Sequence, residues 1–253
     1  DLITWQGENQ GVTRRIPVVI QVSEPLDRAE SRLSGKHDLR ITRSLHGIGA
    51  FAATVPAHRL KELSEDPIIT WISPDREVKG MYTTPGTPNP WTSWWTQPTG
   101  HIATTTGASQ VVGDAFGSGG YTGEGVGVAV IDSGACVGSN CWAFFDDYYN
   151  RTFVYTEDFT SEELPYYQVD AGGDTYGHAT HVASLIAGNG DLSPYGDDFG
   201  GIARRSKLIG LRVLDSHGSG QISDVIAAID RAIELKDVHN IRVINLSLGT
   251  APG

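Results

Sequence analysis

The sequence predicts an α/β protein in which a doubly wound parallel sheet follows a smaller α+β unit. After Gly123, nearly continuous apolar runs alternate with helical patterns, as they do where parallel strands are buried on both faces. Before residue 80, shorter segments follow one another in the order β-α-β-β-α-β. Between the two, residues 81–106 are rich in Thr and Pro, which is the composition of a linker.

The smaller unit, residues 14–80, has the element order of a split βαβ or ferredoxin-like fold. Segment 24–34 is predicted to be a helix because its apolar residues share one face, and Gly35 is expected to end it. Strand patterns and a second helical pattern surround it. They predict strands at 16–22, 39–45, 50–55 and 67–72, and a helix at 56–63.

The larger unit, residues 107–253, alternates strands with helices in the way that builds a parallel sheet. Reactive groups in such sheets collect at the carboxyl ends of the strands. Asp132 directly follows the first apolar run of this unit and therefore occupies such an end. The predicted strands are 126–131, 207–214 and 241–248, and the predicted helices are 179–187 and 222–235.

Charge and hydropathy exclude two classes of partner. The net charge of −11 argues against nucleic acid, and no apolar run reaches the roughly 18 residues of a membrane span. Residues 14–80 carry eleven Lys/Arg and nine Asp/Glu, whereas residues 81–253 carry eight and nineteen. This asymmetry fits either two complementary surfaces or two independently solvated ones. The sequence begins with Asp1 and shows no signal peptide, so we expect that either a leader has been removed or the sequence is a fragment.

Two cysteines, Cys136 and Cys141, lie shortly after Asp132. A single C-x₄-C pair is a poor zinc signature. In an oxidising compartment the pair would form a short-loop disulfide that pins the turn after Asp132. Two reduced thiols are the alternative.

Asp132 and His178 are the candidate catalytic residues. Asp132 ends an apolar strand, and His178 follows a glycine at the start of a helical run of small residues. A serine nucleophile needs a histidine base, and that base needs an orienting carboxylate. The order Asp then His is one of the orders in which such triads occur.

Metal chemistry is the weaker interpretation. His178 and His181 could share a metal ion, but the H-E-x-x-H pattern and an acidic third ligand are missing. The acidic segments 157–163 and 197–198 lack the alternating spacing of a calcium loop, so a structural calcium ion has no support in the sequence. No cofactor is expected for the chemistry.

At this point the joint pattern resembles a known family. Segments 125–134 and 177–183 resemble the Asp box and the His box of the subtilases, the subtilisin-like serine proteases, although Ala179 stands where the family usually has glycine. Segments 213–220 and 243–249 resemble the two edges of the family's substrate cleft. The resemblance implies Asp132 and His178 as catalytic residues, and as substrate-binding residues Gly218, Ser219, Gly220, Ser247, Leu248 and Gly249.

The resemblance also implies a role for residues 14–80. Subtilases are commonly made with a ferredoxin-like propeptide that assists folding and blocks the cleft, and its last residues usually lie in the cleft as product. That tail is expected within residues 75–103. The implied protein is a secreted, monomeric zymogen with protein or peptide substrates and its own propeptide as inhibitor.

The family's third motif, a Gly-Thr-Ser box, is not found in these 253 residues. In subtilisin the serine follows the histidine by about 160 residues, which from His178 falls beyond Gly253. The sequence therefore predicts a truncated subtilisin-like domain that does not hydrolyse peptides by itself and exposes an apolar sheet edge. The alternative is a non-catalytic pseudoprotease or a propeptide-type inhibitor.

Overall fold

The computed structural model describes residues 14–80, 106–108, 121–136, 141, 144, 151–162, 173–189 and 200–250. The chain forms two compact units, the first made of residues 1–77 and 221–230 and the second of residues 78–220 and 231–253. Almost all of the expected linker 81–106, together with residues 163 and 197–198, lies outside the described residues. No helix in the described part of the chain is long and apolar enough to cross a membrane.

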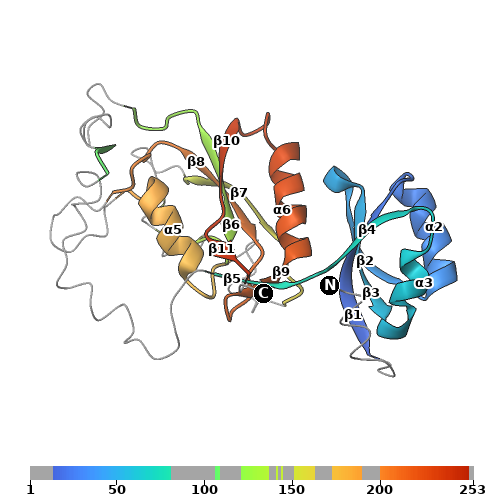
Figure 1. The fold of residues 1–253 in the computed structure, drawn as a ribbon. Coiled ribbons are helices and arrows are strands. Elements are labelled where there is room, and N and C mark those ends of the chain that lie inside the picture. The colour runs from blue at the N-terminus through green and yellow to red at the C-terminus, as the bar shows by residue number, and fades with distance from the viewer. Residues whose placement is uncertain are drawn as a thin grey trace. The chain divides into compact units, whose positions relative to one another are not determined.

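The first unit is an antiparallel sheet with two helices (Figure 1). Its strands lie in the order β2-β3-β1-β4, with β1 paired to both β3 and β4. Strands and helices follow in the predicted order β-α-β-β-α-β. Their bounds are β1 (Arg15–Val22), α2 (Leu26–His37), β2 (Arg40–Leu45), β3 (Ala50–Pro56), α3 (Leu60–Ser64) and β4 (Ile69–Pro74).

Side-chain alternation along β1 builds the core of this unit. Val18 and Ile20 are fully buried on one face of the sheet, where Leu33 of α2 and Leu63 of α3 pack against them. The two helices therefore cover the same face, as their apolar spacing requires.

Helix α2 ends later than the sequence predicts. Gly35 was expected to end it, but the helix continues to His37, and Asp38 ends it with φ 51° in the left-handed region. The reason is burial, because the His37 side chain is fully enclosed and holds the last turn in place. This packing outweighs the low helix propensity of Gly35.

The second unit contains a parallel sheet in the order β10-β6-β8-β7. Helix α5 packs on this sheet, with Ala183 and Ala187 against Val128 and Leu208. Helix α6 crosses the boundary between the two units in the sequence. The bounds are β6 (Gly127–Asp132), β7 (Phe153–Asp158), α5 (His178–Ala187), β8 (Lys207–Arg212), α6 (Ile222–Glu234) and β10 (Ile241–Asn245).

Two details of this sheet differ from the prediction. Strand β7 was missed because it is half-exposed and polar in its second half, so it lacks the apolar run of a doubly buried strand. The strand expected at 241–248 is divided, because β10 pairs with β6 whereas β11 (Leu248–Gly249) belongs to another sheet. Along this divided stretch Val243, Ile244 and Leu246 remain exposed.

That other sheet has three short strands in the order β11-β5-β9. Its central strand is β5 (Glu77–Gly80), and β9 (Ser219–Gln221) is the second edge. Antiparallel pairing places Leu248 opposite Gly80 and Gly249 opposite Lys79. A segment near residue 80 thus lies between two segments that are far along the chain.

Candidate active site

Asp132 is the last residue of β6, a strand in which every residue is buried. Its side chain has no exposure to solvent. Parallel pairing with β8 places Asp132 opposite Arg212, so both side chains lie at the carboxyl edge of the sheet. This is the edge at which α/β sheets bind ligands.

His178 is the first residue of α5, and Gly177 before it adopts φ 90°. That left-handed conformation favours glycine and explains the Gly-His pair in the sequence. His178 Nδ1 lies 2.8 Å from Asp132 Oδ1 and 2.9 Å from Oδ2. The structure therefore brings together the two residues that the sequence predicted, across 46 positions of the chain.

The hydrogen bond that His178 donates to Asp132 raises the pKa of His178, while burial of the ring opposes that rise and the charge of Asp132 adds to it. A carboxylate on Nδ1 holds the proton at that atom and leaves Nε2 as the basic nitrogen of the neutral ring. The pair has the chemistry of an oriented general base.

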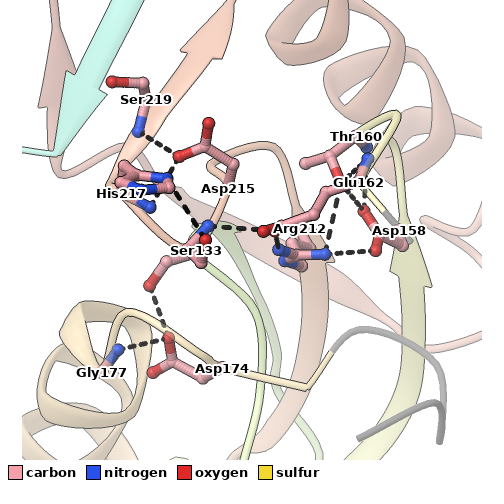
Figure 2. Close-up of polar contacts among 11 residues, drawn as sticks. Ser133, Asp158, Thr160, Glu162, Asp174, Gly177, Arg212, Asp215, His217 and Ser219 are labelled. Carbon is pink, nitrogen blue, oxygen red and sulfur yellow. Dashed lines mark hydrogen bonds and ion pairs between the residues drawn. The ribbon is translucent and has the colours of Figure 1, made fainter. Parts of the chain in front are cut away.

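Two residues that sequence reasoning missed join the strand end to the helix start (Figure 2). Ser133 Oγ donates to Asp174 Oδ1 at 2.7 Å and accepts from the Ala179 N–H at 3.0 Å. Asp174 also accepts from the N–H of Gly177 and of Thr180, both at 2.7 Å. Asp174 could have been found from the sequence, because an acidic residue just before a predicted helix is expected to cap its first turn.

Ala179, the departure from the family's usual glycine, is fully buried in the first turn of α5. Its methyl group is accommodated while the His178 to Asp132 contact keeps a 2.8 Å distance. The N–H of Ala179 is bonded to Ser133, so this position is part of the same network.

His181 lies one turn further along α5. Burial and the neighbouring charge of His178 lower its pKa. Among the described residues no group of three His, Cys, Asp or Glu side chains could hold a metal ion.

One edge of the candidate cleft contains Gly218, Ser219 and Gly220. Gly218 adopts φ 73°, and a Cβ atom on Gly220 would overlap the carbonyl oxygen of Val213. Asp215 shapes the turn, because its carboxylate accepts from the Ser219 N–H at 3.0 Å (Figure 2). Glycine is required here by backbone geometry.

The other edge contains Ser247, Leu248 and Gly249. Leu248 and Gly249 form β11, and Ser247 Oγ donates to Asn245 Oδ1 at 3.0 Å. Strand β5 lies between this edge and β9, and its Gly80 N–H donates to the Gly218 carbonyl at 3.0 Å. Strands β9 and β11, which contain four of the six predicted residues, thus lie on either side of a strand of the chain itself.

Arg212, fully buried at the end of β8, is a further residue that the sequence did not indicate. Its guanidinium bonds Asp158 Oδ2 at 2.6 Å and pairs with Glu162 (Figure 2). Glu162 also accepts from the Ser216 N–H at 3.0 Å. A hydrogen bond from the Ser216 side chain, followed by the one from Arg212, lowers the pKa of Glu162 against the opposing effect of burial. Arg212 therefore supports the loop that leads to β9.

Cys136 and Cys141 are joined in a disulfide with a Cα–Cα distance of 5.6 Å. Cys141 belongs to the core cluster that contains Val128 and Ala183, and the partly buried Cys136 packs against it. The bridge joins two residues that follow the Asp132 strand.

Similar proteins were found by sequence and by fold. The model of the Subtilase family matches residues 123–253. Subtilisin E of Bacillus subtilis (strain 168) is 31% identical over 215 residues, covering 85% of this chain and 45% of that protein. The Minor extracellular protease Vpr of the same organism is 35% identical over 133 residues, covering 52% of this chain and 15% of that protein.

Among solved structures, fervidolysin from Fervidobacterium pennivorans, described as a keratinolytic enzyme related to subtilisin, matches with a TM-score of 0.61 at 18% identity. The match covers 95% of this chain and 36% of that one, and it supports the subtilisin-like α/β fold. The chain spans less than half the length of these relatives. With the family model matching more than half of its residues, the chain belongs to the subtilase family of serine proteases.

Proposed function

We propose that this chain is part of a serine endopeptidase that hydrolyses peptide bonds through Asp132, His178 and a serine outside these 253 residues. The observation that carries the proposal is the contact of 2.8 Å between His178 Nδ1 and the buried Asp132 carboxylate. Strand β5, which lies between β9 and β11, passes close to this contact, since a Cβ atom added at Gly80 would lie 3.8 Å from His178 Nδ1. We infer that these strands supply the substrate-binding element that hydrolysis needs.

In the proposed mechanism His178 accepts the proton of the serine hydroxyl as that oxygen attacks the peptide carbonyl carbon. The Asp132 carboxylate stabilises the imidazolium that forms and keeps the ring oriented. His178 then gives the proton to the leaving amine as the C–N bond breaks, and the acyl-enzyme is hydrolysed by water in the reverse sense. No cofactor takes part in these steps.

Substrates are proposed to bind as an added strand between Gly218–Gly220 and Ser247–Gly249. The support is β5, which pairs with both edges in this structure. Backbone hydrogen bonds of this kind give affinity for any extended peptide, while side-chain subsites give selectivity. The substrate class is therefore protein or peptide.

Residues 14–80 are proposed to be an inhibitor-type propeptide, residues 81–106 the linker with the processing region, and residues 107–253 the first part of the peptidase domain. The β-α-β-β-α-β unit and the position of β5 between the cleft edges support this division. A monomeric, secreted zymogen fits the name of the Vpr relative, an extracellular protease, and the disulfide between Cys136 and Cys141.

The decisive experiment compares the 253-residue chain with the longest protein that contains it. A serine-directed fluorophosphonate should label it, and casein turnover should accompany the labelling, while the 253-residue chain alone should show neither. Labelling that is absent from the longest protein would favour the non-catalytic pseudoprotease or inhibitor instead. Casein turnover by the 253-residue chain would refute the proposed position of the nucleophile.

A further inference from the structure

The turn that leads into β9 is shaped by contacts within itself. The Asp215 carboxylate accepts from the N–H groups of His217 at 2.8 Å and of Ser219 at 3.0 Å. The Asp215 N–H donates in turn to the Ser219 carbonyl at 2.8 Å. These bonds join residues that are two to four positions apart, so they fix the shape of the turn but not its position on the sheet.

Glu162 restrains the position of the turn from a distant part of the chain. It lies 54 positions before Ser216, whose N–H donates to its carboxylate at 3.0 Å. The same carboxylate pairs with the guanidinium of Arg212 (Figure 2). Arg212 is fully buried at the end of β8 and also bonds Asp158, the last residue of β7, at 2.6 Å. Through Glu162 the turn is therefore tied to the ends of two sheet strands.

The candidate catalytic aspartate lies at the same edge of the sheet. Asp132 is opposite Arg212 in the pairing of β6 with β8. Its backbone carbonyl accepts from the N–H groups of Val213 at 2.8 Å and of Leu214 at 3.2 Å. The turn is thus fixed to Asp132 where it begins, and to the strand ends through Glu162 further along. Charge-assisted bonds like that of Glu162 are the stronger kind.

The turn meets β5 at Gly218, two residues after Ser216. The Gly218 carbonyl accepts from the Gly80 N–H at 3.0 Å, and this is the bond that an extended peptide would make in place of β5. Any movement of Ser216 carries this acceptor with it. A shift of about 0.5 Å would take such a hydrogen bond beyond its usual length.

We propose that Glu162 is a positioning residue that, together with Arg212, holds the Gly218 acceptor in place beside the Asp132–His178 pair and so sets the affinity for extended peptides. This rests on the proposed function, since the strand edge that Glu162 positions belongs to the same cleft. Glu162 acts through Ser216 and touches neither the peptide nor the reacting atoms. Its contribution is therefore to binding and not to proton transfer.

A kinetic test uses the longest, serine-containing protein and a casein-derived peptide. Glu162→Ala should raise KM about tenfold and leave kcat within about twofold, because the acceptor on Gly218 moves while the catalytic pair keeps its contact. Glu162→Gln keeps one oxygen acceptor and should recover part of the affinity. Glu124 also pairs with an arginine, Arg205, at 3.2 Å, so Glu124→Ala is the matched control and should leave KM unchanged.

A second test needs no nucleophile, because β5 itself lies between the two strand edges. In the 253-residue chain, Glu162→Ala should raise the amide exchange rate of Gly80 by at least about tenfold, since its N–H loses a well-placed acceptor. Exchange at Val130, a fully buried residue of β6, is the internal reference for general loss of stability and should change much less. Glu124→Ala should leave exchange at Gly80 unchanged.

The two tests separate the failures. An unchanged KM in Glu162→Ala, even with a lower kcat, would overturn the positioning role while leaving the protease assignment intact, because loss of folded protein lowers kcat alone. If the parent hydrolyses no peptide, the proposed function fails and the exchange experiment still decides the role of Glu162. Equal acceleration at Gly80 and Val130, or none at Gly80, would overturn that role by itself.

Discussion

Each of the two units contains a histidine that contacts a buried aspartate, and the two pairs differ in what surrounds them. In the first unit His37 Nε2 lies 3.0 Å from Asp66 Oδ2, and both side chains have no exposure. In the second unit His178 Nδ1 lies 2.8 Å from Asp132, and the histidine side chain keeps 9% exposure. Distance alone does not distinguish a structural pair from a catalytic one.

Position in the fold distinguishes them. His37 is the last residue of α2, where the helix dipole attracts cations, and Lys36 also contacts Asp66 at 2.6 Å. His178 is the first residue of α5, where the dipole disfavours a cation, so Asp132 must stabilise the protonated ring. A His–Asp contact becomes a candidate base where the ring lies beside paired strands at the carboxyl edge of a sheet and its hydrogen bond to the carboxylate is the largest effect that raises its pKa.

The largest expected effect is on activity, and it should distinguish the His178–Asp132 pair from the His37–Asp66 pair. In the serine-containing protein, Asp132→Asn should lower kcat by about 10⁴-fold, because the orienting carboxylate and the correct tautomer are lost. His178→Ala should have at least as large an effect. Asp66→Asn is the matched change in the other pair and should leave kcat with a casein-derived peptide within about twofold. Comparable losses in Asp66→Asn and Asp132→Asn would remove the distinction.

The next largest effect tests the buried cation of the second unit. Arg212→Met should destabilise the protein by about 3 kcal/mol in urea unfolding, because two carboxylates lose their buried partner. Arg212→Lys keeps the charge but not the bidentate fork, and should recover only part of the loss. An Arg212→Met variant as stable as the parent would show that the network is dispensable.

The His37–Asp66 pair in the first unit should make the free energy of unfolding sensitive to acid. Hydrogen bonds from His37 and Lys36 lower the pKa of Asp66 below its ordinary 3.8. Its stabilisation is therefore complete above pH 3.8 and lost as pH falls through the lower folded-state value. Asp66→Asn should lower stability near pH 7 by about 2 kcal/mol and flatten the acid side of the stability curve. Identical acid curves for parent and variant would contradict this role.

The His178–Asp132 pair in the second unit should cause activity to fall on the acid side of the pH profile. Because the pKa of His178 is raised above its ordinary 6.5, the neutral base is lost at a higher pH than for a free histidine. The kcat/KM should fall about tenfold per pH unit below that raised value. The opposite linkage holds for folding, since this charge stabilises the fold below pH 6.5 and that contribution disappears as pH rises through the folded-state value. A limb lying below pH 6.5 would contradict the raised pKa.

The smallest expected effect concerns the support that His178 has and His37 lacks. Asp174→Ala removes the acceptor for the N–H groups of Gly177 and Thr180, and should lower stability by about 1 kcal/mol. Because Ser133 loses its acceptor as well, kcat should fall more than KM changes. Asp174→Asn should recover much of both effects by keeping one acceptor. No change in kcat would limit Asp174 to a structural role.

Most elements could be predicted because their periodicity reports burial. The alternation along β1 and the continuous apolar run of β6 each matched the face, or faces, that the structure buries. Strand β7 could not be predicted, since an edge strand needs only one buried residue at its start. The end of α2 was wrong because burial of His37 outweighed the local preference of Gly35.

By itself the sequence indicated the β-α-β-β-α-β order of residues 14–80, the Asp132 and His178 motifs and the segments that resemble cleft edges, because each is encoded in residues that are neighbours in the chain. Only the tertiary structure decided that Arg212 is buried among carboxylates, that Ser133 and Asp174 join strand to helix, and that β5 lies between β9 and β11. These depend on contacts between residues 41 to 170 positions apart, and local periodicity carries no information on which distant groups meet when the sheet packs.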